Sequence, residues 1–229
     1  MQVLVALLVL KTCAAVLLTF PQYFPADFRA DFLLGRESYF FGSYQWAFYP
    51  HILAGPFCLV LGSLLLSDSM RRRLPAWHRR LGRVQVVAVL LLVAPSGLWM
   101  ARYAATGTVA GVGFATLALA TAFAAAAGWR MALVRRFDQH RLWMQRCYLL
   151  LCAAVVVRVV GGFAETVGID GTYPYAAWLS WLVPLAVFES LRISRRSART
   201  RQSLAWRDAV LGPGPPAESR CDRPKTGRG

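Results

Sequence analysis

Three histidines and one arginine are the side chains of this chain with the clearest capacity for chemistry. Histidine occurs only at His51, His78 and His140, and Arg158 stands inside the apolar run CAAVVVRVVGG. Imidazoles can ligate a metal or a haem iron, and a guanidinium binds carboxylates and phosphates. A charge at the centre of a bilayer costs at least ~2.5 kcal/mol, so we expect Arg158 to have a partner.

Helical spacing divides these residues between the two surfaces of a membrane. His140 and Arg158 are five helical turns apart on one face, so His140 lies near one surface and Arg158 lies toward the other. Glu165 continues that face for two more turns and is a candidate partner of Arg158. His51 lies at a depth similar to that of Arg158. The first candidate site is therefore His51, Arg158 and Glu165, which the charge pattern described below places in the outer leaflet.

The second candidate site lies at the opposite surface. His78 and His140 precede two apolar helices, and Arg146 and Glu189 lie at the same surface. Two imidazoles from facing helices are the donor set of haem b, although the residues leave the identity of any metal open. An alternative interpretation makes these histidines interfacial polar residues, and Glu189 is expected to pair with a cytoplasmic arginine.

Arg158 also has an alternative interpretation, in which it reaches the headgroups or forms a structural ion pair. No catalytic residue is assigned in the chain, because the sequence contains no GxSxG, HExxH or phosphate-loop motif. The five cysteines include no CxxC pair, so we expect neither a disulfide nor a zinc site.

The elements that must position these residues are long apolar helices. Hydrophobic residues make up 57% of the 229 residues, against roughly 45–50% in soluble domains. About 20 helical residues cross a bilayer. Six segments reach that length, at about 2–20, 46–67, 84–102, 108–129, 143–163 and 175–191. The sequence therefore predicts an all-α, polytopic membrane helix bundle over residues 1–192, with the first segment retained as an anchor.

The distribution of charge predicts the orientation of the helices. The net charge of +15 is concentrated in 67–83, 130–146 and 192–229, which carry +5, +4 and +7. Arginines beside helix ends face the cytoplasm, so both termini are expected inside, with anionic headgroups as partners of the arginine clusters. Nucleic acid is not an expected partner. We expect the aromatic loop 21–44 to fold at the outer interface and the basic tail 193–229 to be disordered.

Four sequence blocks resemble a known family. They read HILAGPFCLVLGSLLL, LPAWHRRLGRVQV, FDQHRLWMQRCYLLLCAAVVVR and WLSWLVPLAVFE. In order and spacing they are similar to the signature blocks of the bacterial membrane family called domain of unknown function 2306, over residues 48–190. The resemblance implies a multihelical membrane domain without a known activity. Its signature positions fall on His51, His78, Arg79, Gly82, His140, Trp143, Met144, Arg146, Arg158 and Glu189, whereas Gln85 replaces an aromatic residue.

Three functions remain open at this point. The chain is expected to be a multi-pass protein of a bacterial inner membrane. It could be a structural protein that binds other membrane proteins. It could instead bind or transport a small amphipathic or anionic molecule through His51, Arg158 and Glu165. The third alternative is haem b or quinone-linked electron transfer through His78 and His140. The sequence favours no enzymatic activity.

Overall fold

The computed structural model describes residues 2–30, 32–104, 106–169 and 171–211. Every regular element in these ranges is a helix, so the prediction of an all-α membrane bundle is confirmed. Five helical segments in the described part of the chain have the length and hydropathy of membrane spans. They are Glu37–Leu66, Pro75–Ala101, Thr108–Leu133, Phe137–Val167 and Tyr173–Arg207. Helix α1 (Gln2–Thr19), with 18 residues, is a further apolar helix at the lower length limit.

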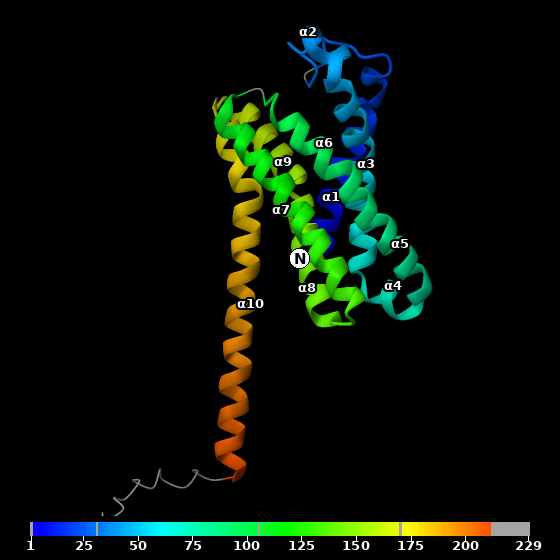
Figure 1. The fold of residues 1–229 in the computed structure, drawn as a ribbon. Coiled ribbons are helices and arrows are strands. Elements are labelled where there is room, and N and C mark those ends of the chain that lie inside the picture. The colour runs from blue at the N-terminus through cyan, green and yellow to red at the C-terminus, as the bar shows by residue number, and fades with distance from the viewer. Residues whose placement is uncertain (1, 31, 105, 170, 212–229) are drawn as a thin grey trace, which may run out of the picture. The chain divides into compact units, whose positions relative to one another are not determined.

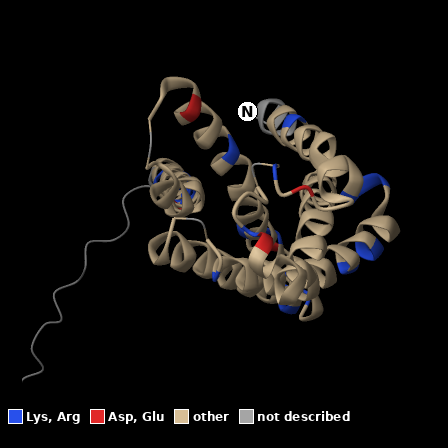
Figure 2. Ribbon diagram, turned by 90° about the horizontal axis from the view of Figure 1, so that it is seen from above, with Lys and Arg blue, Asp and Glu red and all other residues tan. Residues whose placement is uncertain are grey.

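The elements follow each other along the chain with short connections, except for the longer segment 24–36 (Figure 1). After α1 and a 3₁₀ turn, η1 (Phe20–Tyr23), come α2 (Glu37–Tyr39) and the π-helical turn η2 (Phe40–Tyr44). They are followed by α3 (Gln45–Leu66), α4 (Asp68–Arg73), α5 (Pro75–Ala88), η3 (Val89–Val93), α6 (Ala94–Ala101), α7 (Thr108–Leu133), α8 (Phe137–Leu151), α9 (Ala153–Val167) and α10 (Tyr173–Leu211). Figure 2 shows the basic residues in blue and the acidic residues in red on this otherwise uncharged ribbon.

Two units make up the chain, residues 1–185 and residues 186–229. The core of the first unit is built from small and branched side chains of α1, α3, α7, α8 and the segment α5–η3. Cys58, Val89, Ala125, Cys147 and Ala153 are all 0–1% exposed. Small residues let helix backbones approach closely. This close packing stabilises the bundle in lipid, where the hydrophobic effect does not drive helices together.

A widened turn occurs in the span Pro75–Ala101, just before Pro95. The π-helical segment η3 ends two residues before this proline. Proline has no N–H to donate to the carbonyl group four residues earlier, which is that of Leu91, so the regular hydrogen-bond ladder cannot pass through this turn. Ser96 and Gly97, which follow this proline, face α3, as described below.

The aromatic loop between α1 and α3 forms a second, compact core at one end of the bundle. Tyr23, Leu33, Phe40, Tyr44 and Phe48 are buried in it. We call the segment from η1 to η2 the aromatic cap. It lies at the opposite end of α3 from α4 (Figure 1). The loop 21–44 is therefore packed into a core of its own, and its predicted place at the outer interface stays a prediction.

The last helix is longer than the sequence analysis expects. Helix α10 continues to Leu211, whereas the predicted apolar segment ends near residue 191 and the predicted tail starts at residue 193. No proline or glycine occurs between Pro184 and Gly212, so nothing in the sequence stops the helix before that point. Residues 212–229, the rest of the predicted tail, lie outside the described residues.

Candidate functional site

Arg158 lies in the middle of α9, on a span that is otherwise apolar at this depth. Its side chain is exposed and donates a hydrogen bond from Nη1 to the carbonyl oxygen of Ala154, at 3.0 Å. It lies close enough to Tyr23, Tyr173 and Cys13 to interact with them electrostatically. These three groups come from the aromatic cap, the start of α10 and α1. The guanidinium therefore lies within electrostatic range of neutral polar groups from three separate elements.

His51 on α3 packs against a serine and a glycine of α6. Its Nδ1 lies 3.0 Å from Oγ of Ser96. The Ser96 hydroxyl donates to the carbonyl oxygens of Leu92 and Val93, the latter at 3.2 Å, so its oxygen accepts from Nδ1–H. A neutral imidazole then keeps a lone pair on Nε2. A Cβ on Gly97 would lie 3.2 Å from Cε1 of His51, so the ring rests directly on the glycine backbone.

The structure brings His51 and Arg158 together but leaves Glu165 apart. His51 and Arg158 interact electrostatically across α3 and α9. No ion pair joins Arg158 to Glu165 among the described residues. The reason is the direction of the arginine side chain, which turns back one helical turn toward Ala154, whereas Glu165 lies two turns further on, about 10 Å along the axis. Glu165 is exposed to the surroundings.

The aromatic cap contributes a second guanidinium near this cluster. Arg36 donates hydrogen bonds to the carbonyl oxygens of Phe32 and Tyr103, at 2.7 and 2.9 Å. Its guanidinium also lies 5.1 Å from the ring centre of Phe32. Tyr173 lies within electrostatic range of both Arg36 and Arg158. We call Arg158, His51, Tyr23 and Tyr173 the Arg158 cluster.

Sequence reasoning missed the tyrosines and Ser96 as members of this cluster. Tyr23 and Tyr173 lie at helix ends, where the aromatic residues indicated only a membrane interface. Ser96 was visible as part of a Pro-Ser-Gly break, but periodicity within one helix does not say which neighbouring helix a side chain meets. The information that combines these residues is the arrangement of the helices, and a single sequence does not contain it directly.

The second candidate site also has two histidines near each other. His78 on α5 and His140 on α8 interact electrostatically. Nδ1 of His140 lies 2.8 Å from the carbonyl oxygen of Gly128, which fixes the proton on Nδ1 and leaves Nε2 with a lone pair. Nδ1 of His78 is buried without a hydrogen-bond partner. Within the described ranges no group of three or more His, Cys, Asp or Glu side chains could hold a metal ion.

Charged residues near these histidines form a network at the same end of the first unit. Asp68 pairs with Arg71 at 2.9 Å and with Arg141 at 3.2 Å, so α4 and the start of α8 meet there. Arg146 lies over the ring of Trp143, 4.5 Å from its centre. Glu189 belongs to the second unit, where it pairs with Arg192 at 2.9 Å. The expected arginine partner of Glu189 is therefore in its own helix.

A bundle of membrane-length helices that holds a few ionisable groups between its apolar faces defines this chain as a polytopic α-helical membrane protein. It belongs to the family described as Predicted membrane protein (DUF2306), whose model matches residues 48–192, more than half of the chain. The resemblance seen in the sequence blocks is thereby confirmed. The comparisons with curated proteins and with solved structures found no match. The family description specifies a membrane protein and no activity.

Proposed function

We propose that this protein binds a small amphipathic molecule with an anionic headgroup, and that the Arg158 cluster receives the headgroup. The observation that supports this proposal is the composition of the cluster. A guanidinium within a membrane span has two phenols and an imidazole from other elements within electrostatic range, and among the described residues no carboxylate pairs with it. Partners of this kind orient an anion without neutralising the cation beforehand.

The energetics of a charge in lipid favour an external anion. A cation near the bilayer centre costs at least ~2.5 kcal/mol on insertion scales, and an opposite charge at close range offsets that cost. Arg158 compensates partly through the carbonyl oxygen of Ala154, which satisfies one of its five donors. The remaining donors of Arg158 can bind the oxygens of a carboxylate or phosphate group, and the Nε2 lone pair of His51 can accept the proton of a phosphate group that carries one. Such a ligand would enter with its chain in the bilayer.

The proposal is tested with sodium oleate and with oleyl alcohol, which has the same chain but no charge. Bound ligand stabilises the folded protein, by about 2.7 kcal/mol at a hundred times its Kd. For a chain of this size that corresponds to a rise of roughly 5–10 °C in the unfolding midpoint. We expect this rise with oleate, and little rise with oleyl alcohol, for the protein purified in detergent.

Matched arginine variants decide whether Arg158 is responsible. Arg158→Leu should lose the oleate response, and Arg158→Lys should keep part of it because the charge remains without the bidentate fork. Arg102→Leu is the control, because Arg102 lies over the ring of Trp99 at 5.5 Å and outside the cluster. If Arg158→Leu and Arg102→Leu respond to oleate as the unmodified protein does, the proposal is wrong.

We further infer that the protein resides in a bacterial cytoplasmic membrane with both termini inside. The support is the contact of Asp68 with Arg141, which brings the arginine-rich segments 67–83 and 130–146 to one end of the first unit. Cysteine labelling of intact cells tests this orientation. The cysteine of Ser69→Cys should be protected from an impermeant thiol reagent. Rapid labelling there would show that this segment faces the outside and would contradict the proposed topology.

A second candidate function is haem b binding between α5 and α8. The specific observation in its favour is that His78 and His140 lie within electrostatic range of each other and that Nδ1 of His140 is already hydrogen-bonded to the carbonyl oxygen of Gly128. A metal-binding imidazole commonly donates its other N–H in this way. Expression with added haem should then give a reduced Soret band that disappears in His140→Ala, and no band in the unmodified protein would exclude this candidate.

A further inference from the structure

The connection between α7 and α8 carries an arginine in a backbone conformation that ordinarily belongs to glycine. Arg135 has a φ of 57°, and it is the residue other than glycine with a positive φ in the described part of the chain. Its N–H donates to the carbonyl oxygen of Ala132 at 3.1 Å, and the N–H of Arg136 donates to that of Met131 at 2.9 Å. Many helices end in this way, with glycine at the left-handed position. An arginine there is strained, because its Cβ approaches a carbonyl oxygen.

No contact of the Arg135 side chain within the fold compensates for this strain. The residue is exposed, and among the described residues its guanidinium pairs with no carboxylate. A glycine would form the same turn without strain. Strained backbone positions occur mainly where the residue serves a function. The guanidinium of Arg135 therefore indicates a partner outside the chain.

Ion pairs bring a second arginine-rich segment to the same end of the first unit. Oδ1 of Asp68 lies 2.9 Å from Nη2 of Arg71 and 3.2 Å from Nη2 of Arg141. The segments 67–83 and 130–146, which this contact joins, contain eleven arginines and two aspartates. The carboxylates of these segments are too few to neutralise the arginines. The excess of positive charge is complementary to a negatively charged surface.

The position of this basic end relative to the spans favours lipid headgroups over a dissolved polyanion. The span Thr108–Leu133 ends at the turn that contains Arg135, and the span Phe137–Val167 begins there. Leu133 and Phe137, on either side of the turn, are 72% and 65% exposed, and Trp77 of the other arginine-rich segment is 54% exposed. Such side chains enter the interfacial region of a bilayer, while arginines stay with the phosphates. A dissolved polyanion would leave them in water.

We propose that this basic end binds the headgroups of anionic phospholipids and that Arg135 contacts a lipid phosphate. A guanidinium presents two parallel N–H donors to phosphate oxygens. The turn holds this group just beyond the end of α7, where a span leaves the hydrocarbon. The charge of Arg135 is thus retained at the expense of stability. Its exchange for glycine relaxes the turn and removes the lipid contact.

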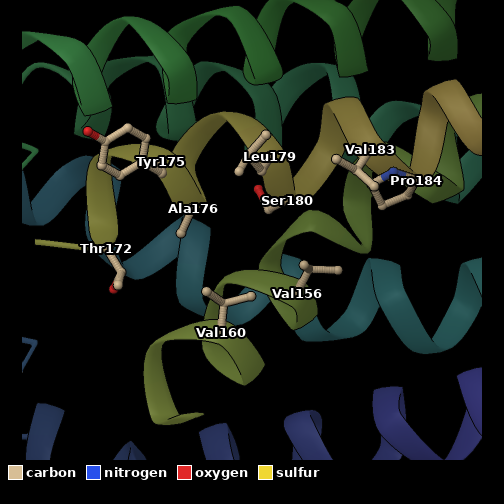
Figure 3. A pocket seen from close by; sticks show the side chains of 9 residues that line it. All are labelled: Val156, Val160, Thr172, Tyr175, Ala176, Leu179, Ser180, Val183 and Pro184. Atoms are coloured by element: carbon tan, nitrogen blue, oxygen red, sulfur yellow. The ribbon is translucent and has the colours of Figure 1, made fainter. Parts of the chain in front are cut away.

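The groove between α9 and α10 is a lipid-facing surface without this selectivity. Val156 and Val160 form one wall, and Ala176 and Leu179 belong to the other (Figure 3). Apolar walls contact acyl chains, which anionic and zwitterionic phospholipids have in common. Val160→Phe should therefore leave the preference for anionic phospholipid unchanged.

The experiment measures thermal unfolding of the full chain in dodecyl maltoside with added phosphatidylglycerol or phosphatidylcholine of the same acyl chains. Bound lipid raises the unfolding midpoint, and phosphatidylglycerol should do so at a lower mole fraction. Without lipid, Arg135→Gly should raise the midpoint by roughly 1–4 °C, because the relief of strain exceeds the entropic cost of glycine. The same variant should need about five times more phosphatidylglycerol for an equal lipid effect, since it lacks one cation at the surface. Arg135→Lys should keep most of the lipid effect.

Two matched variants separate strain from charge. Arg136→Gly removes the same charge from the next residue, whose φ is −87°, so no strain is relieved and the midpoint should fall. Arg102→Gly removes a charge from the opposite end of α7, a helix of 26 residues or about 39 Å. It should keep the response to phosphatidylglycerol.

Inorganic phosphate, compared with sodium chloride at equal ionic strength, distinguishes a lipid from a free anion and should give no rise. The proposal is overturned if phosphatidylcholine or inorganic phosphate acts as phosphatidylglycerol does. It is also overturned if Arg135→Gly melts at a lower temperature than the unmodified protein or responds equally to phosphatidylglycerol. Loss of that response in Arg158→Leu would place the lipid at the Arg158 cluster and overturn it as well. A retained response in Arg158→Leu supports a separate site, and the oleate experiment still tests the cluster.

Discussion

The contact between α6 and α7 at Gly111 allows a stability prediction with a defined magnitude. A Cβ added at this glycine would lie 2.8 Å from the carbonyl oxygen of Ala101, which is backbone and cannot rotate away. An ordinary contact begins near 3.4 Å, so one of the two helices must shift by about half an ångström. Overpacking of this kind typically costs about 1–3 kcal/mol. Gly111→Ala should therefore destabilise the protein by this amount.

Thermal unfolding in detergent measures the effect of Gly111→Ala. For a chain of this length, each kcal/mol corresponds to a shift of roughly 2–4 °C in the midpoint. Gly162→Ala is the matched control, because a Cβ there meets nothing within 4 Å and alanine favours the helix by about 0.5–1 kcal/mol. We expect the Gly111 variant to melt at a lower temperature and the Gly162 variant at an equal or higher one. Equal midpoints for the two variants would refute the assigned packing of α6 on α7.

Two further predictions concern the polar contacts of the first unit. Ser96→Ala removes the acceptor of His51 Nδ1 and should cost about 1–3 kcal/mol, the penalty for an unpaired buried donor, with a weaker oleate response. Thermal unfolding checks it, with Ser194→Ala, an exposed helix serine, as control. Equal stability of the two variants would contradict the contact. Asp68→Asn should cost less than about 1 kcal/mol, because the side chains of Asp68, Arg71 and Arg141 are 41–50% exposed. This destabilisation should disappear in 1 M salt, because salt screens exposed charges. Destabilisation that persists in 1 M salt would contradict this interpretation of the ion pairs.

The positions of the helices could be predicted from the sequence because each span must be apolar along its whole length. Lipid offers no hydrogen bonds to the backbone, so a run of about 20 apolar residues has no stable alternative to a helix. The predicted segments 108–129 and 175–191 accordingly lie within α7 and α10. The sequence analysis expected the tail to begin at residue 193, because a high density of charge is typical of disordered segments. Helix α10 instead continues to Leu211. Residues 193–211 are charged but contain no helix breaker.

The candidate sites could be predicted only in part, for a physical reason. Periodicity along one helix correctly indicates which residues share a face, as for His140 and Arg158. It does not determine the direction of a long side chain. The side chain of Arg158 turns toward Ala154 and away from Glu165. Periodicity also does not identify contributions from loops, and Tyr23 and Tyr173 both come from the ends of helices. Contacts between elements depend on packing, and packing is a property of the whole bundle.

Helix α9 connects these observations, because its two faces have different surroundings. One face directs Arg158 toward α1, α3 and the aromatic cap, and the other presents Val156 and Val160 to the groove beside α10. Substitutions at separated sites without common partners usually add in their free energies. The double variant Arg158→Leu, Gly111→Ala should therefore lose the oleate response and the thermal stability by the same amounts as the two single variants. A combined loss larger than the sum would mean that the Arg158 cluster and the contact between α6 and α7 influence each other.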